Sequence, residues 1–239
     1  MTSSTEKRRY DLPVAATLRL QSRSGRVTVV AEPRDDVEAE TDALEAFQED
    51  DGRTLLVRSS RGGSKPLIVR CPIETDVVVG TQSGPVKLEG RLGVVHITTM
   101  SGSIDVESAE DLDLRTMSGG LTVGVCRGKC RLSAVSGGVR IGETDSAAVG
   151  TVSGGIRLER ARGPVRARTV SGSIEMGASG DSPIAVKTVS GRVHITLPAG
   201  TEPATFFKTR GRVVCEFPRG DDCRIEAASL SGSIEIVPA

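Results

Sequence analysis

Apolar and polar residues alternate along this chain in short segments that repeat around a Ser-Gly pair. When each repeat is numbered from its serine, apolar side chains fall at positions −6, −4, +3 and +5; around Ser171 these are Val165, Ala167, Ile174 and Met176. A spacing of two on both sides is the periodicity of β-strands and not of helices. Each repeat therefore predicts a strand, a Ser-Gly corner, a second strand and a polar turn.

The repeat recurs at a nearly constant interval. Consecutive corner serines from Ser83 to Ser190 are 17 to 19 residues apart, and Ser24 and Ser231 keep the same register. Such a period predicts stacked copies of one unit, with each strand pairing in parallel with its copy in the next. We therefore expect an all-β fold, a β-solenoid, in which glycine lets the chain change face at each corner. The predicted structural corners are Ser83, Gly84, Ser101, Gly102, Ser118, Gly119, Ser136, Gly137, Ser153, Gly154, Ser171, Gly172, Ser190, Gly191, Ser231 and Gly232.

Two regions depart from the regular repeat. Residues 1–80 are predicted to hold N-terminal strands, a first rung at Ser24 and a hairpin from Phe47 to Val57 around Asp51-Gly52, together acting as a cap, while the register lapses between Ser24 and Ser83. Residues 58–66 are predicted to form a flexible loop. Residues 81–239 are predicted to continue as regular solenoid within the same domain.

A degenerate rung is expected near 204–215. There Arg210-Gly211 replaces the Ser-Gly pair and Phe206 takes position −4, with steps of 20 and 21 residues to the neighbouring corners. Aromatic residues occur only in the end regions, so we expect them to plug the core where stacking stops. They are Tyr10, Phe47, Phe206, Phe207 and Phe217.

Net charge, apolar segments and cysteine content indicate which partners and which cellular compartment to expect. The net charge is zero, which gives no global attraction to nucleic acid, and none is expected as a partner. The polar N-terminus has no apolar run typical of a signal peptide, and no window reaches the roughly 20 apolar residues of a membrane span. Five irregularly spaced cysteines favour a reducing compartment. We therefore expect a cytoplasmic protein with no integral membrane segment.

Catalytic and metal chemistry find little support in the residues. A nucleophilic serine needs a base and an orienting group, so a ladder of corner serines is better explained by hydrogen bonds from rung to rung. Cys126 and Cys130 form one close pair, whereas zinc needs four ligands. Cys130 and Cys215 occupy apolar positions of the repeat, and His96 and His194 occupy outward ones. We expect no catalytic residue, no metal and no cofactor.

Enzymes with a β-helix fold suggest an alternative, a polysaccharide-binding or polysaccharide-active protein. The outward +4 column contains the acids Asp105 and Glu175 four rungs apart, roughly 19 Å, which is too far for glycoside hydrolysis. Closer carboxylates would have to come from the turns at 107–113 and 143–145. The full column is Lys87, Asp105, Thr122, Arg140, Arg157, Glu175, His194 and Glu235.

Position −1 forms an apolar column that is a candidate interaction stripe. If the threonines at −2 point inward, the column faces solvent, as expected of an interface. If the corner turns one residue earlier, the column completes the core and the threonines form a hydroxyl ladder outside; we favour this second arrangement. The column is Met100, Met117, Val135, Val152, Val170, Val189 and Leu230.

The recurring phrase from Thr151 to Leu158, T-V-S-G-G-I-R-L, and the segment from Leu18 to Val29 resemble the bacterial "putative adhesin" family, also called the toastrack domain. The resemblance runs from about residue 10 to the end. It implies a β-solenoid of unknown function with no established active site. Several members occur with envelope-stress signalling systems, where a scaffolding role has been proposed.

These observations lead to the expectation of a non-enzymatic scaffold for protein–protein interaction or self-assembly, linked to envelope-stress signalling. The protein partners are not named by the sequence. The chain stops at Ala239 directly after its last strand, which favours a homo-oligomer formed through the solenoid ends, although Pro238 blunts an edge by withholding a donor. A surface adhesin is a further alternative, and it would require export.

Overall fold

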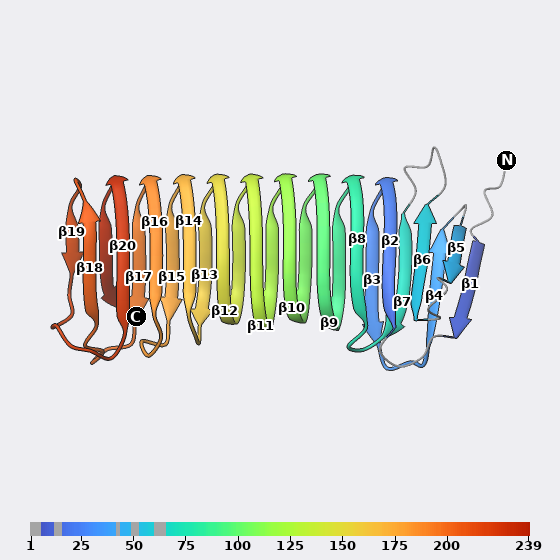
Figure 1. Ribbon diagram of the computed structural model, residues 1–239, viewed down its shortest axis with the longest axis horizontal. Helices are drawn as coiled ribbons and strands as arrows, with labels where there is room; N and C mark the ends of the chain where they lie inside the picture. The colour runs from blue at the N-terminus through green and yellow to red at the C-terminus, as the bar shows by residue number, and fades with distance from the viewer. Residues whose placement is uncertain (1–5, 12–15, 42–43, 49–52, 60–65) are drawn as a thin grey trace. The chain divides into compact units, whose positions relative to one another are not determined.

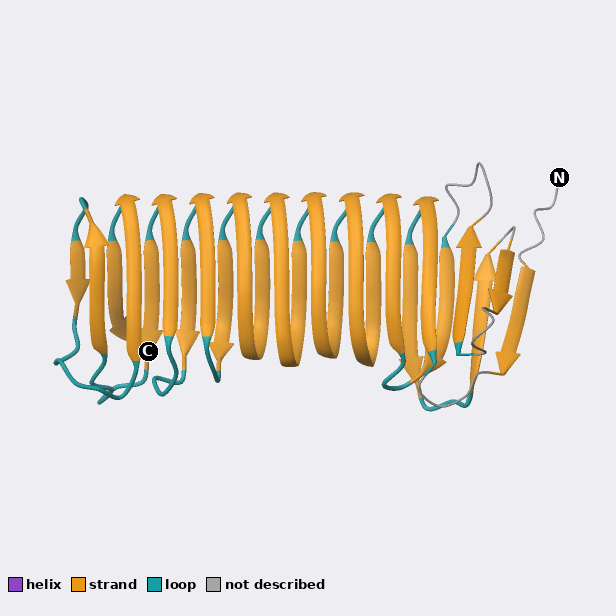
Figure 2. Cartoon of the chain, in the orientation of Figure 1, coloured by secondary structure: helices purple, strands orange, loops and turns teal. Residues whose placement is uncertain are grey.

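The computed structural model describes residues 6–11, 16–41, 44–48, 53–59 and 66–239. Within these ranges the chain consists of strands, turns and loops without a helix, as Figure 2 shows. The predicted β-solenoid fold is confirmed. The chain forms two compact units, Met1–Ser118 and Gly119–Ala239.

The first unit is built from stacked parallel rungs and a set of antiparallel strands. Its described strands are β1 (Glu6–Asp11), β2 (Thr17–Ser24), β3 (Val27–Glu32), β4 (Asp36–Thr41), β5 (Leu44–Gln48), β6 (Thr54–Ser59), β7 (Leu67–Pro72), β8 (Asp76–Ser83), β9 (Val86–Ser101) and β10 (Ile104–Ser118). Corner serines align from rung to rung: Ser24 pairs with Ser83, Ser83 with Ser101, and Ser101 with Ser118. The rung predicted at Ser24 therefore belongs to the stack.

The predicted lapse of register between Ser24 and Ser83 is wrong. β6 pairs in parallel with β2, with Leu55 opposite Leu18, and β7 pairs in parallel with β3. These two strands form a complete rung, and the loop prediction for 58–66 falls mostly on residues 60–65, outside the described ranges. The repeat was hidden because no Ser-Gly pair stands between β6 and β7. This rung lies on the opposite side of β2 from β8, so the stack does not follow the order of the chain.

Antiparallel strands cover the outer side of the β6/β7 rung. β5 pairs with β6, β4 with β7, and β1 with β4, all antiparallel (Figure 1). The pairing of β5 with β6 confirms the strands of the predicted hairpin, whose Asp51-Gly52 turn lies outside the described residues. An uncovered rung would present a row of free backbone donors and acceptors. That residues 1–80 act as a cap for the whole chain stays a prediction.

The second unit continues the same repeat. Its strands are β11 (Leu121–Ser136), β12 (Val139–Ser153), β13 (Ile156–Ala161), β14 (Val165–Ser171), β15 (Ile174–Ala178), β16 (Ile184–Ser190), β17 (Val193–Leu197), β18 (Ala204–Thr209), β19 (Val213–Cys215), β20 (Arg224–Ser231) and β21 (Ile234–Pro238). Inward positions are buried as predicted; Val165, Ala167, Ile174 and Met176 are at most 3% exposed. The core of each rung is thus built from small aliphatic side chains.

The degenerate rung does not lie where the sequence order places it. β16 pairs directly with β20 and β17 with β21, while β18 and β19 pair with the other side of β20 and β21 (Figure 1). The predicted sequential stacking of this rung is therefore wrong. In the inner place, the core positions of β20 and β21 are at most 1% exposed; they are Ile225, Ala227, Ile234 and Ile236. The terminal strand is consequently internal, and Pro238 pairs with Leu197.

The degenerate rung also differs in register from the prediction. Phe207, and not Phe206, lies opposite Ala227, the −4 residue of its neighbour, and the Phe206 side chain is 53% exposed. The physical reason is a one-residue deletion: Arg210 alone separates Thr209 from Gly211, where regular corners have two residues. The prediction that aromatics plug the core is wrong for Phe206 and for Phe47, which is 55% exposed.

The structure places the predicted Ser-Gly pairs at the corners. Backbone N–H groups of the corner glycines donate to the corner serine carbonyls of the next rung at 3.0 to 3.2 Å. Gly137 has φ +145°, and a Cβ atom there would lie 2.0 Å from the Gly119 carbonyl oxygen. The described hydrogen bonds between corners thus run through the backbone and require glycine for both its conformation and its small size.

Candidate interaction surface

The apolar column at position −1 faces solvent. Its members are 44 to 56% exposed, whereas the threonines at −2, such as Thr151 and Thr169, are 2 to 7% exposed. The favoured arrangement, with the column in the core, is therefore wrong. Strand alternation continues through −1, and the change of face comes at the glycine. Two of the inward threonine hydroxyls have acceptors in the next rung: Thr151 Oγ1 donates to the Gly137 carbonyl and Thr169 Oγ1 to the Gly154 carbonyl, both at 3.3 Å. The buried hydroxyls of Thr99, Thr116 and Thr188 have no hydrogen-bond partner among the described residues.

In the second unit the column is a row of four valines followed by Leu230 on β20, which pairs with β16. Val135, Val152, Val170 and Val189 lie on β11, β12, β14 and β16, whose corner serines are in register. Adjacent parallel strands are about 4.8 Å apart, so neighbouring side chains touch. We call these four residues the valine stripe. In the first unit Met100 and Met117 occupy the same position on β9 and β10.

A group of cations flanks the valine stripe on the same outward face. Arg131 on β11, Arg166 and Arg168 on β14, and Lys187 on β16 occupy positions −5 and −3 and are exposed. None of the four forms an ion pair within the described part of the chain. The other residues at −5 and −3 of these strands are small and carry no carboxylate; they are Ser133, Ala148, Gly150 and Ala185. We call the four cations the basic band; sequence reasoning missed it, although its signal is present at fixed repeat positions.

The opposite outward face, which bears the +4 column, is electrically mixed. Arg157 lies 3.8 Å from Glu175, and His194 lies 3.5 Å from Glu235. A shallow depression there is lined by Arg140, Arg157 and Glu175 and contains one carboxylate. Because glycoside hydrolysis needs two carboxyl groups at a fixed separation, this depression offers no such pair.

The acids of 107–113 and 143–145 lie within the continuous strands β10 and β12, so the turns predicted at these two segments are wrong. Several of these acids are engaged locally. Glu107 accepts a hydrogen bond from the Gly90 N–H at 2.8 Å, and Glu143 pairs with Arg162. Asp113 accepts from Arg115 at 3.0 Å. These carboxylates therefore bind neighbouring rungs and residues, which is the arrangement expected of structural groups.

The cysteine side chains are free thiols. Cys71, Cys126, Cys130 and Cys223 are buried, and Cys215 is half-buried in the outermost rung. A hydrogen bond with Cys126 and burial both raise the pKa of Cys130, and burial raises the pKa of Cys71 to about 11. These two thiols stay protonated at neutral pH. No group of three or more metal-ligating side chains occurs among the residues that the structure describes.

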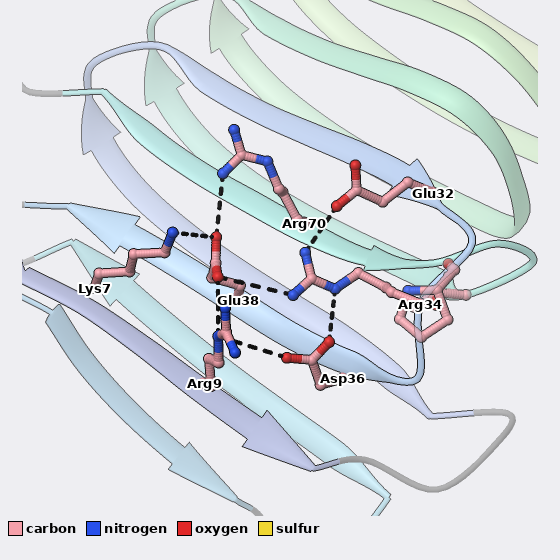
Figure 3. A network of polar contacts seen from close by, with 9 residues as sticks. Lys7, Arg9, Glu32, Arg34, Asp36, Glu38 and Arg70 are labelled. Carbon is pink, nitrogen blue, oxygen red and sulfur yellow. Dashed lines mark hydrogen bonds and ion pairs between the residues drawn. The ribbon is translucent and has the colours of Figure 1, made fainter.

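A dense charged cluster joins the antiparallel strands of the first unit. Glu38 on β4 is 4% exposed and accepts from Lys7 at 2.9 Å, Arg9 at 3.1 Å and Arg70 at 3.2 Å (Figure 3). Arg34 extends the cluster by donating to Glu32 at 2.8 Å and to Asp36 at 2.9 Å. The cluster links β1, β4 and β7, so we assign it to holding these strands together.

Acid is expected to loosen this part of the first unit. The hydrogen bond from Lys7, opposed by desolvation and aided by Arg9, lowers the pKa of Glu38 below its ordinary value of 4.5. A lowered pKa means that the stabilisation is complete above the ordinary pKa and is lost as pH falls through the folded-state pKa. The protection factors of the β1 and β4 amides, which correct the exchange rates for the intrinsic slowing of amide exchange in acid, should therefore fall below about pH 4.

A variant pair checks the assignment to Glu38. Glu38→Gln should lower the protection factors of the β1 and β4 amides at neutral pH. It should also flatten their dependence on acid, because the titrating carboxyl group is gone. Asp35→Asn, at an exposed neighbour outside the cluster, should behave like the wild type. Retention of the full acid dependence in Glu38→Gln would contradict the assignment.

Comparison with known proteins agrees with the geometry. The model of the Toastrack DUF4097 family matches residues 17–236, and the chain belongs to this family of β-solenoid domains. A crystal structure described as a "putative adhesin" from Parabacteroides distasonis ATCC 8503 has a TM-score of 0.52 at 12% identity, with 98% of each chain covered. Another so described, from Bacteroides fragilis NCTC 9343, has a TM-score of 0.49 at 14% identity and 98% coverage of both chains. No match was found among curated proteins.

The family match and the Parabacteroides distasonis structure establish the fold alone. Family membership favours a non-enzymatic role. Among the described residues there is no helix long and apolar enough to cross a membrane.

Proposed function

We propose that this protein is a non-enzymatic scaffold that binds an acidic segment of a partner protein through the valine stripe and the basic band. The observation that carries the proposal is the juxtaposition of four half-exposed valines and four unpaired cations on one sheet face of the second unit. Contiguous exposed apolar residues are typical of interfaces, and unpaired cations beside them select for negative charge. Among the residues that the structure describes, no comparable cluster of groups supports an enzymatic activity.

The basic band also argues against self-association through this face. A second copy laid on the same surface would bring Arg166, Arg168 and Lys187 against their own equivalents. Like charges placed together across an interface are unfavourable, so an acidic partner fits better.

A defined probe tests the proposal. A peptide of alternating glutamate and leucine, followed by fluorescence anisotropy, should bind the wild type and weaken with added salt. The variant Arg166→Glu/Arg168→Glu/Lys187→Glu should bind about tenfold less tightly, because each of three rim charge pairs contributes about 0.5 kcal/mol.

A matched triple charge reversal on other surfaces of the same unit serves as the control. Arg127→Glu/Arg140→Glu/Arg160→Glu, at three exposed positions, should leave peptide binding within about twofold of the wild type, since rim charges act locally in salt. Equal weakening of peptide binding by both variants would show that net charge alone causes the effect, and it would refute the assignment of the binding surface.

Cytoplasmic localisation and a link to envelope-stress signalling belong to the same proposal. The five free cysteines support a reducing compartment. Fractionation of the native host, followed by identification of proteins retained by the wild type and lost with the basic-band variant, would test both points.

A further inference from the structure

A different surface of the second unit is open at the outermost rung. Within the described residues β18 is hydrogen-bonded only to β20, and β19 only to β21. Inward residues of the adjacent rung are fully buried, yet Val213 is 38% exposed and Thr205, Phe207 and Cys215 are half-buried. Both the backbone ladder and the apolar core therefore stop at this rung with nothing over them. An edge of this kind is a template for another strand.

Charge along this edge is polarised from one end to the other. At the start of β18, Glu202, Asp221 and Asp222 are exposed beside Arg219. Arg224, opposite Ala204, is also exposed there and pairs with Glu226 at 2.7 Å, so the acids outnumber the free cations at this end. Asp222 is fixed there because its carboxylate accepts from the Glu202 N–H at 2.8 Å and its own N–H donates to the Glu202 carbonyl at 3.1 Å.

The opposite end of the edge strand is basic. Lys208, Arg210 and Arg212 are exposed around the degenerate corner, and none forms an ion pair among the described residues. A strand with an acidic start and a basic end is complementary to itself only when two copies run antiparallel.

We propose that β18 and β19 pair with the same strands of a second copy of this chain across a two-fold axis. In such an isologous dimer each basic end faces the acidic end of the partner, whereas a parallel arrangement would place like charges together. Pairing would also bring the half-exposed Phe207, Val213 and Cys215 of both copies together and continue the core. An isologous contact uses the same edge of both copies, so pairing through β18 and β19 closes at a dimer.

Charge-reversal variants test the dimer without touching the core. Light scattering over a concentration series should give a mass approaching twice 25.0 kDa for the wild type. Lys208→Glu/Arg210→Glu reverses two of the three cations at the basic end and should be monomeric. Glu202→Lys/Asp221→Lys reverses two of the three acids at the acidic end and should also be monomeric. Mixing the two variants should restore a dimer, because each then meets an opposite charge.

Controls separate this surface from general effects. Arg127→Glu, an exposed charge change elsewhere in the unit, should dimerise like the wild type, and circular dichroism should show all variants folded. A wild-type monomer at every concentration, or a dimer that survives in both edge variants, would overturn the proposal. The glutamate–leucine peptide should bind the monomeric Lys208→Glu/Arg210→Glu variant as it binds the wild type, so the dimer and the proposed scaffold function can fail separately.

Discussion

Replacing Gly137 by alanine is expected to destabilise the second unit by about 3 kcal/mol or more, equivalent to a fall in melting temperature of about 6–12 °C. Two effects add. The φ of +145° is open to glycine and strained for any residue with a side chain, and the new Cβ would lie 2.0 Å from the Gly119 carbonyl oxygen. The neighbouring rung cannot move aside, because the Gly119 N–H donates a hydrogen bond to the Ser136 carbonyl, directly beside Gly137.

Gly138 supplies the matched control for this prediction. It is the next residue, it is exposed, and its added Cβ would meet only the Gly155 carbonyl oxygen at 3.7 Å. Gly138→Ala should therefore change the free energy of unfolding by no more than about 1 kcal/mol. Thermal unfolding followed by circular dichroism compares the pair, and equal losses in both variants would refute the role given to the corner glycine.

The same substitution is expected to be strongly destabilising at one of two neighbouring residues and nearly neutral at the other. Thr151→Asp should destabilise by about 3 kcal/mol or more, because it buries a carboxylate at a 6% exposed site facing the Gly137 carbonyl oxygen. Val152→Asp should stay within about 0.5 kcal/mol of the wild type, because its side chain is 48% exposed.

Denaturant titration of the two variants decides which side of the sheet each residue occupies. Thr151→Val provides a volume-matched reference that loses only the hydroxyl. A large loss of unfolding free energy in Val152→Asp, together with a small loss in Thr151→Asp, would show that Val152 points inward and would contradict an exposed valine stripe.

The sequence predicted the regular part of the fold well because burial there is local and periodic. Val165, Ala167, Ile174 and Met176 could be assigned to the core from their spacing alone, and the structure buries all four. The orientation of position −1 was harder. Valine and threonine both occur on either face of a strand, so the residues at −2 and −1 did not show where the corner begins. The arrangement with the column in the core was favoured, and it is wrong.

The interaction surface was only half visible in the sequence. The apolar column was recognised from its position in the repeat, whereas the basic band went unnoticed because Arg131, Arg166 and Lys187 are separated by 17 residues or more. The other residues at positions −5 and −3 are small, and this becomes apparent only when the strands are aligned in register. Likewise, Glu38 on β4 pairs with cations from two other strands, β1 and β7, and no local sequence pattern indicates that cluster.

What the sequence by itself determined is the repeating unit: strand, Ser-Gly corner, strand, and the identity of the buried residues. Alternation of apolar side chains and the special conformation of glycine act within one rung, so neighbouring residues suffice to predict them. The order of stacking was decided only by the tertiary structure. β6 and β7 follow β3 in the chain yet lie on the far side of β2 from β8, and β20 and β21 displace β18 and β19 from the inner place. Each rung pairs with whichever copy offers the better buried face, and that competition between distant segments leaves the degenerate rung with an open edge.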